Sequence, residues 1–390
     1  MKTSADFSSE FSRNDADFRR FRRVQFRLTL ATEYIYEYWH AAGLNPIKEN
    51  FDVRGWEFNS FSFYNETKGE EVVGAECQYF SGSVDFVGKL HFVDEAMLER
   101  LEVADVSGKV CYIDTMKAGG VLKKNVIAKT LEDLGALGVI FIASDHLGNY
   151  PSTKTVRSPH IEKIACVAVT PLAAAYIKQH KDDTFALKID AKPYDTKASN
   201  VSLTLGEGAK RITLGAHSDA APLIQGASDN ASGTAILLEL AKLVKESGID
   251  LDGFTLEFST FNAEEYIPTL FAPGSEYYLK TRWGENIVCY LNLDDIGINY
   301  ATPSILLYHS EKIPDINYPY PTEIREKEKW VGDEKPFTYS GIPAVFFTDK
   351  KHFGGLIHTK ADTVQFLSYE KMEKVLHDGF DVLLQLLSKY

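Results

Sequence analysis

Hydrophobic residues in the second half of the chain form short apolar runs that alternate with longer amphipathic stretches. The apolar runs predict strands, and the stretches with apolar residues on one face predict helices. The strands are expected over residues 212–216, 254–261, 287–293 and 343–347, and the helices over 229–246, 274–280 and 369–387. Because strands that alternate with helices build sheets covered on both faces, this part predicts an α/β fold with a mostly parallel mixed sheet.

The first half of the chain has a different pattern. Residues 15–44 show the spacing of a long amphipathic helix that stops at Gly43, and residues 51–63 alternate loosely as a half-buried strand does. Many short β-like runs follow over residues 65–197, with one helix-like segment at 125–134. We therefore expect an inserted β-rich α+β domain at 65–197 and a main domain made of residues 1–64 and 198–390.

Length and charge narrow the possible functions. A chain of 390 residues exceeds the size at which one hydrophobic core usually stops growing, so an insertion or a second domain is expected. The formal net charge of −13 disfavours a nucleic-acid partner, because such binding depends on lysine and arginine. The first residues lack the pattern of a secretory signal, and no run is apolar enough to span a membrane. A cytoplasmic protein with no membrane partner is expected.

The four cysteines are far apart in the sequence and form no C-x-x-C pair. A disulfide framework or a thiolate metal site therefore has little support, and we expect buried thiols.

Acidic residues and histidines follow the ends of the predicted strands. In open α/β sheets, ligands bind beyond the carboxyl ends of the strands, so these side chains are expected at one edge. Those that follow a strand or open the next helix are His217, Asp219, Asp229, Glu264, Glu265, Asp294 and His358. Carboxylates and imidazoles crowded into a cleft need cations, and an oxygen and nitrogen donor set suits zinc, with manganese or cobalt as possible substitutes. Asp229 could bridge two such ions.

Each of these residues also has an ordinary structural interpretation. His217 alone could be a buried histidine paired with Asp219, and Asp229 alone could cap the helix that follows it. The Glu264–Glu265 pair could be a solvated loop end, and His358 could form a surface hydrogen bond with Asp362. The metal interpretation is favoured because charges follow strand ends in several separate segments.

The chain resembles the zinc aminopeptidases with co-catalytic metals, a family whose relatives include glutamate carboxypeptidases, glutaminyl cyclases and the transferrin receptor. The matching segments are G-A-H-S-D, G-A-S-D-N-A-S-G-T-A, F-N-A-E-E, N-L-D-D-I-G, S-G-I-P-A-V-F-F and H-T-K-A-D-T, between residues 214 and 363. In addition, G-K-V-C-Y-I-D at 108–114 and the helix and strand after it resemble a protease-associated domain.

The resemblance implies a role for each matching residue. It implies two Zn²⁺ ions per chain, one held by His217, Asp229 and Asp294 and the other by Asp229, Glu265 and His358. Glu264 matches the general base, and Asp219 and Asp362 match the acidic residues that orient the histidines. The residue types agree with this, because a carboxylate two positions after a histidine can accept its second ring N–H.

Three positions depart from the family pattern. The loop after Glu265 is longer than in many relatives, and Glu334 stands where relatives often have histidine. Ile357 occupies the position of a tyrosine that stabilises the oxyanion in several relatives, which leaves three unranked candidates for that donor: Tyr266, Tyr300 and Tyr339.

The function expected is that of a metallo-aminopeptidase, a dinuclear zinc exopeptidase that removes N-terminal residues from short peptides. A carboxypeptidase or glutaminyl cyclase of the same fold is the alternative among enzymes. A non-catalytic, receptor-like binding protein is the alternative from another class, and it would be indicated by missing ligands.

Overall fold

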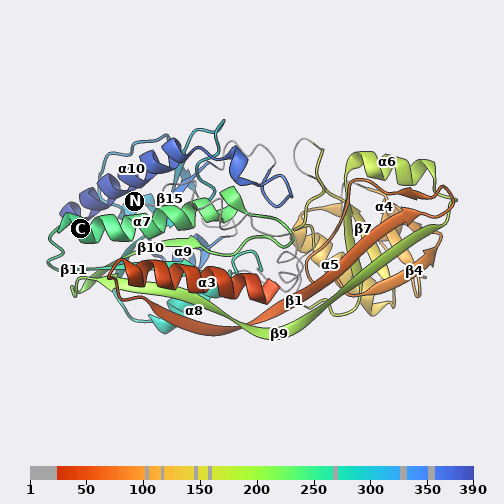
Figure 1. Ribbon diagram of the computed structural model, residues 1–390, viewed down its shortest axis with the longest axis horizontal. Helices are drawn as coiled ribbons and strands as arrows, with labels where there is room; N and C mark the ends of the chain where they lie inside the picture. The colour runs from red at the N-terminus through yellow and green to blue at the C-terminus, as the bar shows by residue number, and fades with distance from the viewer. Residues whose placement is uncertain are drawn as a thin grey trace.

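The computed structural model describes residues 24–101, 105–115, 118–144, 148–156, 160–266, 271–325, 332–349 and 356–390. They form an elongated molecule in which two lobes are joined by a long ribbon of two strands (Figure 1). The larger lobe holds the last helix and most of the second half of the chain. The smaller lobe is built from residues between the two ribbon strands.

The larger lobe is organised around a mixed sheet with the strand order β14-β13-β15-β12-β10-β11-β9-β1-β2, to which β4 adds beside β9. Its four central strands are mutually parallel: β15 (Ala344–Thr348), β12 (Ile287–Leu293), β10 (Lys210–His217) and β11 (Phe254–Phe261). Antiparallel pairing begins where β13 (Ser304–Tyr308) meets β15 and where β9 meets β11; β14 (Thr322–Arg325) runs parallel to β13. The central strands are almost continuously buried, as expected for a sheet covered on both faces.

Helices cover both faces of this sheet. Helices α3 (Val24–Ala41), α7 (Ser232–Ser247) and α10 (Tyr369–Lys389) lie on one face, where Trp39, Leu237 and Leu383 join the largest core. On the other face, α8 (Pro273–Thr281) and α9 (Glu334–Tyr339) pack over an aromatic core, in which the rings of Tyr290 and Phe337 stack 3.9 Å apart. The expected mixed α/β fold is confirmed.

The smaller lobe contains a second sheet of five strands in the order β3-β8-β7-β6-β5. Strands β5 (His91–Val93), β6 (Val110–Ile113), β7 (Gly138–Ile142) and β8 (Ala165–Val169) are parallel, and β3 (Ala75–Cys77) is antiparallel to β8. The described residues of this lobe form the helices α4 (Glu95–Leu98), α5 (Val121–Asp133) and α6 (Pro171–Gln179). Residues of α5 complete a core of their own against the sheet, which includes Ile127, Leu131 and Phe141.

The ribbon is formed by β1 (Ile47–Asn65) and β9 (Phe185–Leu205), which pair antiparallel along almost their whole length. One end of β9 pairs with β11, while its other end pairs with β4 (Val84–Gly88); the far end of β1 pairs with β2 (Glu70–Glu71). The predicted boundary at 64–65 coincides with the end of β1, and the one at 197–198 falls inside β9. The ribbon is therefore shared by the two lobes.

The predicted elements of the larger lobe are present with small shifts at their ends. The helix expected over 15–44 is seen as α3, and its first part lies outside the described residues. The four cysteines are free and buried, as expected, and burial raises the pKa of Cys111 and Cys289 to about 12. Among the described residues, no helix is both long and apolar enough to cross a membrane.

Candidate metal centre

Three neighbouring parallel strands bring the predicted residues to one edge of the large sheet. His217 ends β10 and lies opposite Phe261, the last residue of β11, so Glu264 and Glu265 follow at the same level. Asp294 comes directly after β12, the neighbour of β10 on its other side. All of these side chains are almost completely buried.

Asp229 does not cap the helix that follows it. It lies in a π-helical turn, Ala227–Ala231, with non-helical backbone angles, and α7 begins only at Ser232. The predicted start of this helix at Asp229 was therefore three residues early, and no capping hydrogen bond is made there. The Asp229 carboxylate instead points to two histidines.

Gly233 lets this turn approach the end of β12. A Cβ atom at this position would lie 2.2 Å from the main-chain oxygen of Leu293 and 2.3 Å from Asn230 Oδ1. Asn230 also donates a hydrogen bond to Leu293 O at 2.8 Å and accepts one from Gly233 N at 3.0 Å. The close packing brings Asp229 and Asp294 to the same place.

The first group of potential ligands consists of His217, Asp229 and Asp294. His217 Nε2 is 3.0 Å from Asp229 Oδ1 and 3.2 Å from Asp294 Oδ1. The second group consists of Asp229, Glu265 and His358, in which His358 Nε2 is 2.9 Å from Asp229 Oδ2 and 3.5 Å from Glu265 Oε1. In each group the ligand atoms lie within 4.8 Å of one another. The two groups share Asp229, which turns one carboxylate oxygen to each histidine.

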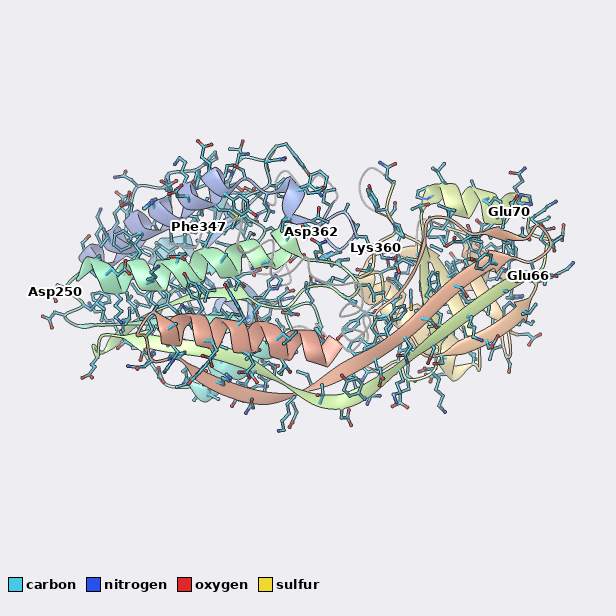
Figure 2. The ribbon with its side chains drawn as sticks, in the orientation of Figure 1. Glu66, Glu70, Asp250, Phe347, Lys360 and Asp362 are labelled. Atoms are coloured by element: carbon cyan, nitrogen blue, oxygen red, sulfur yellow. The ribbon has the colours of Figure 1, made fainter. Side chains whose placement is uncertain are left out.

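His358 reaches the centre from the loop after β15. Its backbone is in the left-handed region, with φ of 57°, and its carbonyl accepts a hydrogen bond of 2.9 Å from Thr153 N of the smaller lobe. Figure 2 shows the labelled Lys360 and Asp362 of the same loop in the middle of the molecule, between the two lobes. The centre therefore lies where the lobes meet.

Asp219 lies beside His217, as expected, and also supports the turn after β11. The ring nitrogen Nδ1 of His217 is hydrogen-bonded, at 3.0 Å, to the main-chain oxygen of Asp219, while the carboxylate is 3.6 Å away. The carboxylate oxygens accept the backbone N–H groups of Glu264 and Glu265, each at 3.0 Å. The side chain thus holds the turn that presents both glutamates, and the main chain and carboxylate of Asp219 both lie at Nδ1 of His217.

Asp362 lies behind the turn that carries Asp229, and its expected role in orienting a histidine stays a prediction. Its carboxylate accepts hydrogen bonds from Ser228 N at 2.8 Å, Ser228 Oγ at 2.9 Å and Asp229 N at 3.2 Å. Burial raises the pKa of Asp362 despite these donors. Asp362 therefore orients the turn that carries Asp229.

The electrostatics of the centre favour positive charge between the carboxylates. Burial acts to lower the pKa of His217, but hydrogen bonds with Asp219, Asp229 and Asp294 outweigh it and hold the pKa well above its usual value. Burial acts to raise the pKa of Asp229, yet contacts with His217 and His358 hold it well below its usual value. A metal cation would satisfy the same carboxylates that here favour a protonated imidazole.

Two residues near the centre were missed by sequence reasoning. Asp333, before α9, is buried, and burial together with the charge of Glu264 raises its pKa well above the usual value. It belongs to the G-D-E-K-P-F segment, which departs from the family pattern at the neighbouring Glu334, also buried. Lys154 comes from the smaller lobe and contacts Glu265. Its surrounding sequence, P-S-T-K-T-V, contains no recognisable signal.

The three tyrosines considered as oxyanion donors lie in different settings. Tyr266 is buried against Tyr79, with the two rings 4.7 Å apart. Tyr300 is half exposed, and burial and then the charge of Asp362 raise its pKa. Tyr339 packs edge-on against Phe271. The charge interaction with Asp362 associates Tyr300 with the centre.

The sequence and fold are similar to those of known peptidases. A model of peptidase family M28 matches residues 200–378. Aminopeptidase YwaD of Bacillus subtilis (strain 168) is 26% identical over 293 residues, which cover 70% of this chain and 61% of that protein. The chain spans 61% or less of the length of the curated relatives that it matches.

Solved structures share the fold over both lobes. BSAP, a zinc aminopeptidase from Bacillus subtilis, superposes with a TM-score of 0.71 and 19% identity, covering 92% of this chain and 89% of that one. The aminopeptidase from Aneurinibacillus sp. strain AM-1 gives a TM-score of 0.65 and 22% identity, with coverage of 92% and 88%. The family resemblance read from the sequence is confirmed by the match of residues 200–378 to the model of peptidase family M28.

Proposed function

We propose that this protein is a dinuclear zinc aminopeptidase acting on short peptides. The observation that carries the proposal is the position of Asp229, whose Oδ1 lies 3.0 Å from His217 Nε2 and whose Oδ2 lies 2.9 Å from His358 Nε2. A carboxylate that faces two separate imidazoles in this way is suited to bridging two cations.

The donor set fits zinc. His217, Asp229 and Asp294 would hold one ion, and Asp229, Glu265 and His358 the other. Imidazole nitrogens and carboxylate oxygens without thiolates form a usual set for catalytic zinc, and manganese or cobalt could substitute. The main-chain oxygen of Asp219 supports this assignment, because a hydrogen bond at Nδ1 leaves Nε2 of His217 for the ion.

Bound zinc would lower the pKa of a coordinated water and polarise the peptide carbonyl. Glu264 is the proposed general base: its carboxylate would take the proton from the water and return it to the departing amine. Asp219 holds Glu264 and Glu265 through their backbone N–H groups, so that one glutamate can bind metal while its neighbour handles the proton. Asp219 thus acts as a positioning residue.

The aminopeptidase direction is supported by the relatives, because the printed names of YwaD, BSAP and the AM-1 protein all describe aminopeptidases. A carboxypeptidase or glutaminyl cyclase on the same fold is the alternative. The test is a panel of dipeptides with a free amine, a blocked N-terminus or a blocked C-terminus, combined with metal analysis. Cleavage that requires the free amine is expected; cleavage of N-blocked peptides instead would overturn the proposed direction.

The domain organisation remains part of the proposal. Residues 1–64 and 198–390 would form the catalytic domain, and residues 65–197 an inserted domain like the protease-associated domains, sharing the β1–β9 ribbon. A cytoplasmic location remains a prediction from the sequence. Limited proteolysis that releases a stable fragment covering most of 65–197 would support these boundaries.

A further inference from the structure

Lys154 reaches the metal centre from the smaller lobe. It lies between β7 and β8, and only 7% of its side chain is exposed. Its ammonium contacts Glu265 Oε2 and lies 3.2 Å from His358 Nε2 and 3.7 Å from Glu264 Oε2. An ammonium from one lobe therefore lies among the acidic and imidazole groups of the other.

The loop that carries Lys154 is held in place on both sides. The buried Gln78 donates a hydrogen bond to Ser152 O and accepts one from Thr155 N, both at 2.7 Å. Thr153 N donates to the carbonyl oxygen of His358 at 2.9 Å. These bonds fix the backbone on either side of Lys154 and tie it to the loop that carries His358.

The ammonium and the proposed second cation would use the same groups. Glu265 and His358 form the second group of ligands with Asp229, and Lys154 contacts both of them. Nε2 of His358 is the atom that faces Asp229 and Glu265, so an ammonium next to it lies where the ion would bind. Two positive charges a few ångströms apart repel strongly in a buried site.

We propose that Lys154 is a further residue of the metal centre, whose ammonium competes with the second zinc ion for Glu265 and His358. This inference rests on the proposed dinuclear function. The second ion can bind only as the ammonium withdraws, which the flexible four-carbon stem of lysine allows while the loop stays fixed. The second site therefore binds zinc more weakly than the first, and the smaller lobe sets that difference.

The test measures zinc affinity in Lys154→Met, which removes the charge at similar volume. Zinc binding is followed by competition with a chromophoric chelator, and stoichiometry by elemental analysis. The second site is expected to tighten by about tenfold or more, because the competing charge is gone, while the first site changes little. Lys154→Arg keeps the charge and is expected to retain the weak second site.

Lys163→Met is the matched control, because Lys163 is an exposed lysine of the same lobe. It should bind zinc as the wild type does, and thermal unfolding should show that all variants fold. Competition by Lys154 is overturned if Lys154→Met binds both ions with the same affinities as the wild type, or if the variant loses the second ion. In either case, two ions bound by the wild type would still support the proposed function. If neither the wild type nor any variant binds zinc, the competition by Lys154 and the proposed dinuclear function are both overturned.

Discussion

The two sheets of this protein are built alike but differ in the residues that follow their strands. Strands β6, β7 and β8 of the smaller lobe are buried at every position, as β11 is in the larger lobe. After β11 and β12, however, come Glu264, Glu265 and Asp294, whereas β8 is followed by Thr170, whose hydroxyl caps α6. Buried apolar runs form both sheets, and the chemistry depends on the short segments after them.

One carboxylate of the smaller lobe makes the contrast specific. Asp114 directly follows β6, in the position that Asp294 has after β12. It forms an ion pair of 2.8 Å with Lys178 of α6. Asp294 instead shares His217 with Asp229. A carboxylate after a strand becomes a candidate ligand only where neighbouring strands supply others.

The largest effect should come from Glu264→Gln compared with Asp114→Asn. Loss of a general base is expected to lower kcat by roughly 10²–10⁴-fold, with zinc content unchanged. Asp114→Asn removes a carboxylate that follows a buried strand of the smaller lobe and belongs to neither group of proposed ligands, and it should leave kcat unchanged. Steady-state kinetics on zinc-loaded proteins tests both. Full turnover by Glu264→Gln would contradict the assignment of the base.

Gly233→Ala tests how the centre depends on close packing at the end of β12. The added methyl group would meet Leu293 O at 2.2 Å, so we expect a loss of about 3 kcal/mol in the free energy of unfolding. The control is Gly379→Ala in α10, where nothing lies within 4 Å and a helical alanine should stabilise by up to about 1 kcal/mol. Urea unfolding measures both. Equal changes in the free energy of unfolding for the two variants would show that the close contacts at position 233 do not require glycine.

Asp219→Asn should weaken the centre without removing a ligand. An amide can accept the N–H of only one of Glu264 and Glu265, because its other end is a donor. Zinc affinity is expected to fall by roughly 10–100-fold, as is typical when a group behind the ligands is changed. Asp85→Asn, an exposed carboxylate of the smaller lobe paired with Lys188, serves as the control. Unchanged zinc affinity in Asp219→Asn would refute the positioning role.

The smallest effect concerns Glu132 of the smaller lobe and depends on pH. Burial acts to raise its pKa, but hydrogen bonds from the backbone N–H groups of Lys163, Glu162 and Ile164 and from Lys129 outweigh burial and lower it. A lowered folded pKa stabilises the protein above the unfolded pKa, near 4.5, and this contribution disappears as the pH falls through the folded pKa.

Glu132→Gln should therefore reduce stability at pH 7 by about 1–2 kcal/mol and have little effect at about pH 2. Asp133→Asn, in which only an exposed pair with Lys129 is lost, is the control and should change stability by less than about 1 kcal/mol. Unfolding free energies measured across this pH range test the difference. If Glu132→Gln lowers the free energy of unfolding equally at both pH values, the lowered pKa of Glu132 does not contribute to stability.

The order of strands and helices in the larger lobe and the proposed ligands could be predicted because both depend on local patterns. Apolar runs identify buried strands, and parallel strands place their carboxyl ends at one edge. His217, Glu265 and Asp294 could thus be grouped before any distance was known. The long ribbon could not be predicted, because the two half-buried strands β1 and β9 pair residues that are more than a hundred positions apart in the sequence.

The sequence by itself indicated the resemblance to the family, the α/β order and the set of charged residues at the strand ends. Only the tertiary structure decided which groups each of them contacts. Asp219 holds two backbone N–H groups, Asp362 holds the turn of Asp229, and Lys154 enters from the other lobe. The physical reason is range: strand and helix patterns repeat within a few residues, whereas hydrogen bonds and ion pairs depend on distances of a few ångströms between segments far apart in the chain.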